Sequence, residues 1–314
     1  MFDVVSVFPA DVLDLEQVGS KEKFWFVRTD AEENEEEWLC KLSRRHAGED
    51  WSEKIAAELC EHLGLPHAVY ELATYDHPTE GPLRAVISKR IDTGATRLVL
   101  GDELLADHAN RYEQAPQEGY FINPEYTLDL VLSTLDSSAL TVQIRDDWTL
   151  PPGVRTPSDV FVGYLMLDAW IGNTDRHDQN WAVLETDGKA EARLFLAPTF
   201  DHASCLGREL RDSLRRQKLN ATTPEHSIVG YIQKCYSRFV AASGSSDVLH
   251  VREVFQRAQR AAPDAATAWL DCLRTISDAD LCALFEKIPD DRITTSATDF
   301  ALDLLTRNRD ALLQ

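Results

Sequence analysis

The sequence is short of basic residues. Its 314 residues include 32 lysines and arginines against 53 aspartates and glutamates, which gives a formal net charge of −21. Binding to nucleic-acid phosphates or to an anionic membrane surface depends on an excess of basic groups. We therefore expect neither a nucleic acid nor a membrane as a direct partner.

Long apolar runs and clustered cysteines are also lacking. The longest apolar run, residues 160–171, is interrupted by Asp168 and is too short to span a bilayer. The first residues have neither the basic start nor the apolar stretch of a signal peptide. The six cysteines form no CxxC pair, so we expect reduced, mostly buried thiols. These observations together predict a cytoplasmic protein that is long enough to form two lobes.

The pattern of the first part, residues 1–91, is typical of β-strands with one helix among them. Ser52 is the expected cap of that helix and Gly64 its end. The strands are expected at 24–27, 37–42, 68–72 and 83–91.

The second part, residues 92–314, is expected to be mostly helical, apart from a hairpin at 181–196. A buried helix over 160–171 follows a capping sequence that begins at Thr156. The predicted fold class is therefore α+β and bilobal, with a β-rich N-terminal lobe and a mostly helical C-terminal lobe.

The loop after the buried helix concentrates acids, amides and an imidazole. Four residues separate Asp175 from Asn180, which is the spacing of the catalytic Asp and the metal-binding Asn in a protein-kinase loop. Asp201 follows the hairpin, where it is expected to share a Mg²⁺ ion with Asn180. This pattern predicts phosphoryl transfer from ATP, with Asp175 orienting or deprotonating the acceptor hydroxyl.

Phosphoryl transfer also needs a cation that holds the phosphates. Lys41 lies on a predicted strand and Glu53 lies in the helix that follows, and protein kinases pair a Lys and a Glu in these places. The segment 18–23 contains a single glycine instead of a Gly-rich loop, and the chain has no Walker A motif.

Further residues are expected either to support the loop or to contact the nucleotide. His177 is expected mainly to orient its loop, and Asp168 is expected to support that loop as a buried acid. The candidates for contact with the nucleotide are Gly19, Ser20, Lys21, Lys23, Lys41, Arg90 and His177.

Four stretches of the sequence resemble the HipA-like bacterial kinases. They are GSKEK at 19–23, DWSEKIA at 50–56, DAWIGNTDRH at 168–177 and APTFDHAS at 197–204. The resemblance runs from about residue 15 to the C-terminus. It implies a protein-kinase-like fold, related to the phosphoinositide 3/4-kinases, that uses ATP and Mg²⁺ to phosphorylate protein serine or threonine hydroxyls.

The resemblance also implies what the protein acts with. The chain resembles the short, stand-alone members of the family, without an extra N-terminal domain. Several family members are toxins, so an antitoxin is a candidate partner and a translation factor a candidate substrate. Ser20 is a candidate for autophosphorylation.

Three alternative functions remain open at this stage. One is a lipid or small-molecule kinase of the phosphoinositide-kinase-like class. Another is a catalytically silent kinase-fold scaffold, which the single glycine near Ser20 leaves open. The third is a metal-dependent phosphohydrolase with one or two metals. Its ligands would be Asp175, His177, Asp178, Asp201 and His202.

Overall fold

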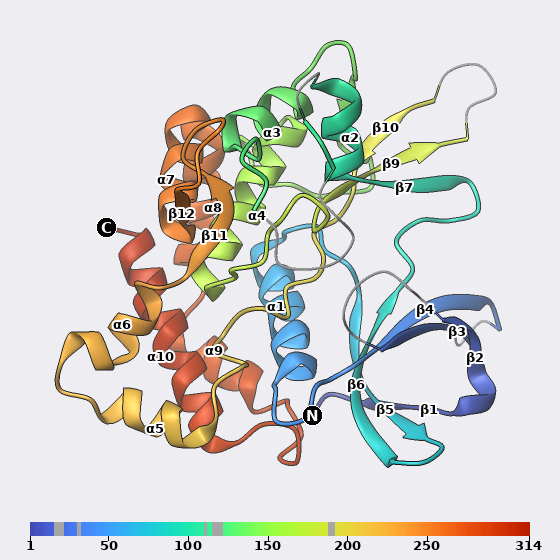
Figure 1. Ribbon diagram of the computed structural model, residues 1–314, viewed down its shortest axis with the longest axis vertical. Helices are drawn as coiled ribbons and strands as arrows, with labels where there is room; N and C mark the ends of the chain where they lie inside the picture. The colour runs from blue at the N-terminus through green and yellow to red at the C-terminus, as the bar shows by residue number, and fades with distance from the viewer. Residues whose placement is uncertain (16–21, 30–32, 110–111, 115–121, 188–191) are drawn as a thin grey trace.

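A computed structural model describes residues 1–15, 22–29, 33–109, 112–114, 122–187 and 192–314. The N-terminal lobe is built on a sheet whose described strands have the order β1-β5-β6-β4-β3-β2 (Figure 1). Strands β1 and β5 are parallel, and the other neighbours are antiparallel. The strands are β1 (Val4–Val7), β2 (Val12–Leu15), β3 (Lys23–Thr29), β4 (Glu35–Leu42), β5 (Tyr70–His77) and β6 (Gly81–Lys89), with a 3₁₀ turn, η1 (Pro9–Asp11), between β1 and β2.

The two faces of this sheet have different roles. Trp38, Cys40 and Leu42 of β4 point to one face, where they join Phe24 and Phe26 of β3 in a small apolar core. Because side chains alternate along a strand, Leu39 and Lys41 point to the other face. That second face is the one that the helix of this lobe covers.

Helix α1 (Glu49–Leu63) lies between the sheet and the helices of the C-terminal lobe (Figure 1). Gly64, in the left-handed conformation, ends it as predicted. The predicted start is wrong, because Gly48 is the N-cap and Ser52 lies inside the helix. The Ser52 hydroxyl is buried and donates to the Ala203 carbonyl of the other lobe, so a tertiary contact replaces the expected cap.

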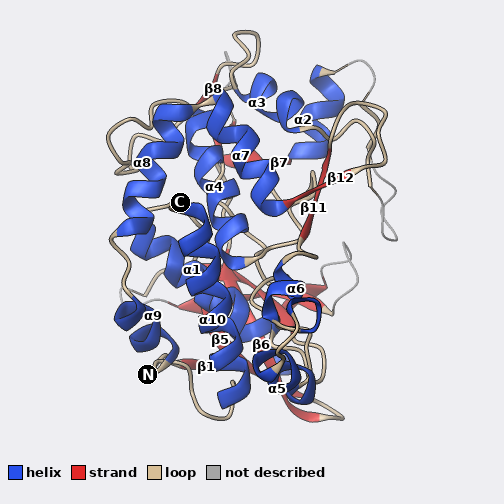
Figure 2. Ribbon diagram, turned by 90° about the vertical axis from the view of Figure 1, so that its left-hand side faces the viewer, coloured by secondary structure: helices blue, strands red, loops and turns tan. Residues whose placement is uncertain are grey.

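Helices make up most of the C-terminal lobe (Figure 2). They are α2 (Gly101–His108), α3 (Leu128–Leu135), α4 (Pro157–Ile171), α5 (Asp212–Asn220), α6 (Ile228–Ile232), α7 (Val251–Ala261), α8 (Pro263–Arg274), α9 (Asp278–Phe285) and α10 (Thr295–Leu312), with one 3₁₀ turn, η2 (Pro224–His226). Helix α4 is apolar nearly all round and packs against α7, α8 and α10. Thr156 and Asp159 form the predicted capping box at its start.

Two smaller sheets complete this lobe among the described residues. One has the order β7-β9-β10-β8, in which β9 and β10 are the predicted hairpin; β7 and the short β8 were not predicted. Their bounds are β7 (Thr96–Leu100), β8 (Val142–Gln143), β9 (Ala182–Thr186) and β10 (Leu194–Leu196), and the second sheet pairs β11 (Tyr236–Val240) with β12 (Val248–His250).

The predicted α+β class, with a β-rich lobe holding one helix and a mostly helical second lobe, is confirmed. All six cysteines are free, and four of them are buried. No helix in the described part of the chain is long and apolar enough to cross a membrane.

Candidate active site

Lys41 lies on the face of the N-terminal sheet that α1 covers. It is opposite Lys23 on β3 and opposite Val86 on β6, and directly opposed residues share a face. Val86 packs against Ala57 of α1, which fixes the identity of this face. The two lysines are therefore neighbours on the face that turns toward α1.

The Lys41 ammonium forms an ion pair with Asp201, with 3.4 Å between Nζ and Oδ2. Burial alone would lower the pKa of Lys41. The carboxylates of Asp201 and Glu53 outweigh burial, so the pKa is raised above its ordinary value. Lys41 is therefore a fixed positive charge at neutral pH.

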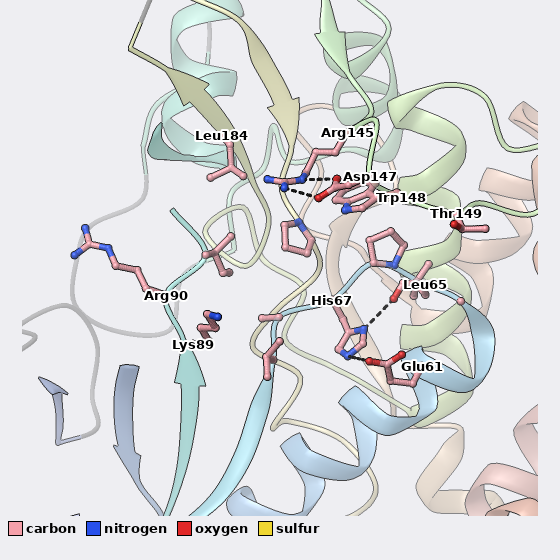
Figure 3. A pocket seen from close by; sticks show the side chains of 16 residues that line it. Glu61, Leu65, His67, Lys89, Arg90, Arg145, Asp147, Trp148, Thr149 and Leu184 are labelled. Atoms are coloured by element: carbon pink, nitrogen blue, oxygen red, sulfur yellow. Dashed lines mark hydrogen bonds and ion pairs between the residues drawn. The ribbon is translucent and has the colours of Figure 1, made fainter. Parts of the chain in front are cut away.

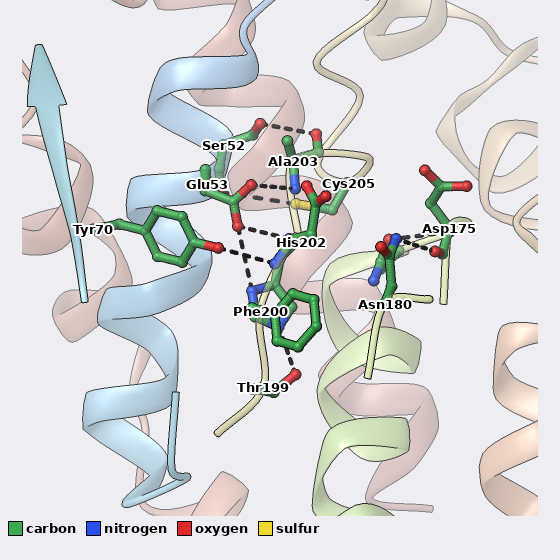
Figure 4. A network of polar contacts seen from close by, with 12 residues as sticks. Ser52, Glu53, Tyr70, Asp175, Asn180, Thr199, Phe200, His202, Ala203 and Cys205 are labelled. Carbon is green, nitrogen blue, oxygen red and sulfur yellow. Dashed lines mark hydrogen bonds and ion pairs between the residues drawn. The ribbon is translucent and has the colours of Figure 1, made fainter. Parts of the chain in front are cut away.

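The predicted ion pair between Lys41 and Glu53 is wrong. Figure 4 shows that Glu53 instead binds the segment that follows Asp201. Its Oε1 accepts from the His202 backbone N–H at 2.6 Å, and its Oε2 accepts from that of Ala203 at 3.0 Å. Two backbone donors satisfy the buried carboxylate more completely than one ammonium would. The negative charge of Glu53 thus raises the pKa of Lys41, and its two hydrogen bonds hold the backbone that follows Asp201.

Asp201 has a left-handed backbone, with φ of +57°. Asp is one of the few residues other than Gly that adopt this conformation readily. Its backbone N–H donates to the Tyr70 hydroxyl at 3.0 Å, and Glu53 holds the next two residues. Strand β5 and helix α1 therefore fix the turn that presents the Asp201 carboxylate to Lys41.

The loop after α4 is held by a buried ion pair. Arg176 donates to Asp168 through Nε at 2.8 Å and through Nη2 at 2.9 Å. Asn173 donates to the same carboxylate at 2.7 Å. The side chains of Asp168 and Arg176 are 5 % and 1 % exposed, so the contact lies in the interior. The prediction that Asp168 is a structural acid supporting this loop is confirmed.

Arg176 also joins the two predicted metal ligands. Its Nη1 donates to the Asn180 carbonyl at 2.6 Å and contacts the carbonyl of Phe200, the residue before Asp201, at 3.5 Å. The Asn180 Nδ2 donates to the Asp175 carbonyl at 2.7 Å, which leaves Oδ1 without a donor among the described residues. Asn180 thus offers an amide oxygen, and Asp201 offers a carboxylate. Such oxygen ligands suit Mg²⁺, which binds few protein oxygens in addition to nucleotide phosphates.

The Asp175 carboxylate is about one-third exposed and has two side-chain partners. Arg238 of β11 donates to Oδ1 at 2.6 Å, and Ser204 donates to Oδ2 at 3.4 Å. Sequence reasoning missed Arg238, because nothing in the pattern of β11 distinguishes it. Ser204 belongs to the stretch that resembles the HipA-like kinases, and it received no role.

The other predicted nucleotide-binding residues lie in different places. Lys23 is beside Lys41, as described above. His177 accepts from the Gln179 backbone N–H at 3.1 Å, a contact within its own loop, and its roles in orienting the loop and in nucleotide contact stay predictions. Arg90 packs over the Trp25 ring at 5.2 Å and forms ion pairs with Glu37 and Asp92. Gly19, Ser20 and Lys21 lie outside the described residues.

Two of the side chains expected as metal ligands of a phosphohydrolase contact other protein residues instead. His202 is buried against Thr199 and Glu53, and Asp178 accepts from the Tyr112 hydroxyl. The described residues contain no group of three His, Cys, Asp or Glu side chains arranged to hold a metal. The geometry is therefore wrong for the predicted one- or two-metal hydrolase.

A cavity of about 620 Å³ lies near the end of β6, and Figure 3 shows its side chains. It is lined by Lys89, Arg90, His67 and Trp148 among others, and Pro198 brings the segment before Asp201 to its wall. Lys41, Asp175, Asn180 and Asp201 themselves do not line this cavity.

Comparisons with solved structures show what the fold is similar to. The Helicobacter pylori proinflammatory kinase CtkA has a similar fold, with a TM-score of 0.74 and 18 % identity over 99 % of this chain and 96 % of that one. Two other solved kinase-like structures match far more weakly. An apo pseudokinase gives a TM-score of 0.29 at 9 % identity, over 85 % of this chain and 97 % of that one. The amicoumacin kinase hAmiN, in complex with AMP-PNP and Ca²⁺, gives 0.27 at 10 % identity, over 98 % and 90 %.

No curated protein matches the chain. The model of the HipA-like C-terminal domain matches residues 16–269, which is more than half of the 314 residues. The resemblance expected from the sequence is confirmed, and the chain belongs to the HipA-like C-terminal domain family.

Proposed function

We propose that the protein is a kinase that uses ATP and Mg²⁺ to phosphorylate a serine or threonine hydroxyl of another protein. The observation that carries the proposal is the convergence of three segments on one point. Lys41 contacts Asp201 at 3.4 Å, and Arg176 ties the backbone of Asn180 to that of Phe200, next to Asp201. Asn180 in turn holds the backbone of Asp175.

Each residue has a defined role in this proposal. Lys41 contacts the ATP phosphates, and Asn180 with Asp201 holds Mg²⁺, which neutralises charge on the transferred group. Glu53 is a positioning residue that fixes the Asp201 turn through two backbone N–H groups. The buried ion pair between Arg176 and Asp168 holds the loop that carries Asp175 and Asn180.

Asp175 receives the proton of the acceptor hydroxyl. The hydroxyl oxygen forms a bond to the γ-phosphorus, the bond from that phosphorus to the β,γ-bridging oxygen breaks, and ADP leaves with the electron pair. Positioning and charge stabilisation supply most of the rate. Arg238 and Ser204 hold the two oxygens of the Asp175 carboxylate in place for this step.

Family membership and net charge support the proposed acceptor and partners. Membership of the HipA-like family supports a protein hydroxyl, with a translation factor as candidate and an antitoxin as candidate partner in the cytoplasm. A net charge of −21 favours a basic segment around the acceptor hydroxyl. Autophosphorylation, with Ser20 as candidate, is part of the same proposal.

The test compares γ-phosphate transfer by the wild type, by Asp175→Asn and by Asp187→Asn. Asp187 is an exposed acid directly after β9 and serves as the matched control. We expect Asp175→Asn to lose at least about a hundredfold in transfer while keeping ATP binding, and Asp187→Asn to behave as wild type. Phosphoproteomics on cells expressing wild type or Asp175→Asn then identifies the acceptor. Equal transfer by Asp175→Asn and wild type would exclude Asp175 as the base, and ATP binding without transfer to any acceptor would indicate a silent scaffold.

A further inference from the structure

A second cavity, of about 480 Å³, lies where three helices begin. The N-caps of α1, α5 and α10, which are Gly48, Arg211 and Thr294, all line it. The cavity is cationic in a chain that carries a net charge of −21. Its basic side chains are His46, Arg84, Arg211, Arg215 and Arg292. Among the described lining residues Asp212 is the only acid, so positive charge is concentrated here against the trend of the molecule.

Three of these arginines are bonded to protein acceptors, and two of the three keep one N–H without an acceptor among the described residues. Arg84 and Arg292 share the buried carboxylate of Asp50. Arg215 contacts Asp212 at 2.9 Å. Arg215 and Arg292 are 6 % and 3 % exposed, and the Nε–H group of each is buried without an acceptor among the described residues. These three arginines are thus held in place by the protein and add fixed positive charge to the wall of the cavity.

Arg211 differs from the other three arginines. It is exposed at the mouth of the cavity and forms no ion pair with another described residue. A guanidinium with a free fork, next to helix N-termini whose N–H groups carry partial positive charge, matches the oxygens of a phosphate group. The volume of the cavity is several times that of a phosphate group, which leaves space for the molecule that carries it.

We propose that this cavity binds the phosphate of a phosphate monoester and that binding strengthens the arrangement around Asp175. The part of the proposal that concerns Asp175 rests on the proposed kinase function, whereas the binding does not. The ester has two sources with the same chemistry, a free small molecule or a phosphorylated residue of this chain.

Hydrogen bonds connect the cavity to Asp175. Arg215 donates through Nη2 to the carbonyls of Gly207 at 3.0 Å and Arg208 at 3.3 Å. Arg208 donates to the Ser204 hydroxyl at 3.0 Å, and Ser204 donates to Asp175 at 3.4 Å. A ligand that binds Arg211, the N-cap of α5, therefore fixes the start of that helix and, through Arg215 and Arg208, the hydroxyl that contacts Asp175.

The same ligand would fix α1. The Gly48 N–H donates to the Arg208 carbonyl at 3.0 Å, and the Arg208 side chain forms an ion pair with Glu49 in the first turn of the helix. Helix α1 carries Glu53, which holds the turn at His202. Occupancy of the cavity would thus stabilise both supports of the candidate active site.

Binding is tested first, with inorganic phosphate and O-phosphoserine as probes. The melting temperature of the wild type, Arg211→Gln and Arg216→Gln is followed as phosphate replaces chloride at constant ionic strength. Arg216 is the matched control, because it is an exposed residue of α5 that does not line the cavity. We expect phosphate to raise the melting temperature of the wild type and of Arg216→Gln, and about tenfold more phosphate to be needed in Arg211→Gln. The same phosphate dependence in all three proteins would overturn the proposal.

The source of the ester and the effect on Asp175 are tested second. If a phosphorylated residue of this chain occupies the cavity, incubation with ATP will abolish the phosphate-dependent rise in wild type but not in Asp175→Asn. If phosphate still raises the melting temperature of both the wild type and Asp175→Asn after incubation with ATP, the ligand is a free ester. Transfer by wild type should increase severalfold with the probe, and Arg211→Gln should need about tenfold more probe. Binding without any transfer would refute only the kinase function, whereas transfer that the probe leaves unchanged would refute the coupling to Asp175.

Discussion

At the scale of single residues, Lys41 is a positive charge whose pKa is raised above the ordinary 10.5, because the carboxylates of Asp201 and Glu53 outweigh burial. A raised pKa means that the stabilising charge is fully present below the unfolded pKa and is lost only as the pH rises through the folded value. We therefore expect ATP affinity to stay level between about pH 7 and pH 9.5 and to fall only above roughly 10.5. A fluorescent ATP analogue measures this, with Lys41→Gln as the variant without the charge. Lys41→Gln should bind about tenfold more weakly throughout, and a midpoint near neutral pH in the wild type would contradict the assignment.

Arg238 is the residue that fixes Asp175 from the far side of the site. Its Nη2 donates to Oδ1 at 2.6 Å, and its side chain is 16 % exposed. Removing this contact in Arg238→Gln leaves Ser204, at 3.4 Å, as the remaining side-chain partner of the carboxylate among the described residues, so we expect the transfer rate kcat to fall about tenfold while the KM for ATP is unchanged. Arg238→Lys keeps the charge and should recover part of the rate. A change in KM with an unchanged kcat would place Arg238 in nucleotide binding instead.

The sequence could predict those site residues that lie in short, characteristic spacings. Asp175 and Asn180 lie in one short loop with four residues between them. The hairpin of β9 and β10 follows this loop, and Asp201 comes soon after the hairpin. Arg238 could not be predicted, because it lies 63 residues from Asp175 and reaches it only through the packing of β11. The Lys41–Glu53 pair was mispredicted because spacing places both residues near one site without determining which acceptor a buried carboxylate takes.

At the scale of elements, α4 and its loop depend on one buried ion pair. The side chains of Asp168 and Arg176 are 5 % and 1 % exposed, and breaking such a pair leaves an uncompensated interior charge. Asp168→Ala should therefore lower the free energy of unfolding by about 3–5 kcal/mol. The double variant Asp168→Leu with Arg176→Met should lose less, because no charge remains buried.

Urea denaturation followed by circular dichroism measures both variants of this pair. Equal losses in the single and the double variant would mean that the cost arises from packing around α4 and not from the unpaired Arg176 charge. Neither measurement requires an active protein, so it tests the support of the loop apart from any catalysis.

Element boundaries were predictable where local chemistry acts alone. The capping box of Thr156 and Asp159 starts α4 as expected, because both partners lie within one turn. The start of α1 was not, because Ser52 makes its bond to Ala203, which is 151 residues away. Strand β1 pairs with β5 through residues 68 positions apart, such as Val4 and Leu72, a connection that no local pattern encodes.

At the scale of the whole molecule, the net charge of −21 constrains how an anion such as ATP is bound. In the site itself the Lys41 charge is offset by Asp201, so the Lys23–Lys41 pair alone provides little surplus. A divalent cation at Asn180 and Asp201 would reverse that balance. We expect ATP affinity of the wild type to fall at least tenfold when Mg²⁺ is replaced by EDTA at constant ionic strength. In Asp201→Asn the lysine charge is no longer offset, so metal-free ATP should bind more tightly than to wild type, while Mg²⁺ should add little. Titration calorimetry measures the ATP affinity of the wild type and of Asp201→Asn, each with and without Mg²⁺. If the wild type binds ATP equally well with and without Mg²⁺, Asn180 and Asp201 do not bind the nucleotide through a metal ion.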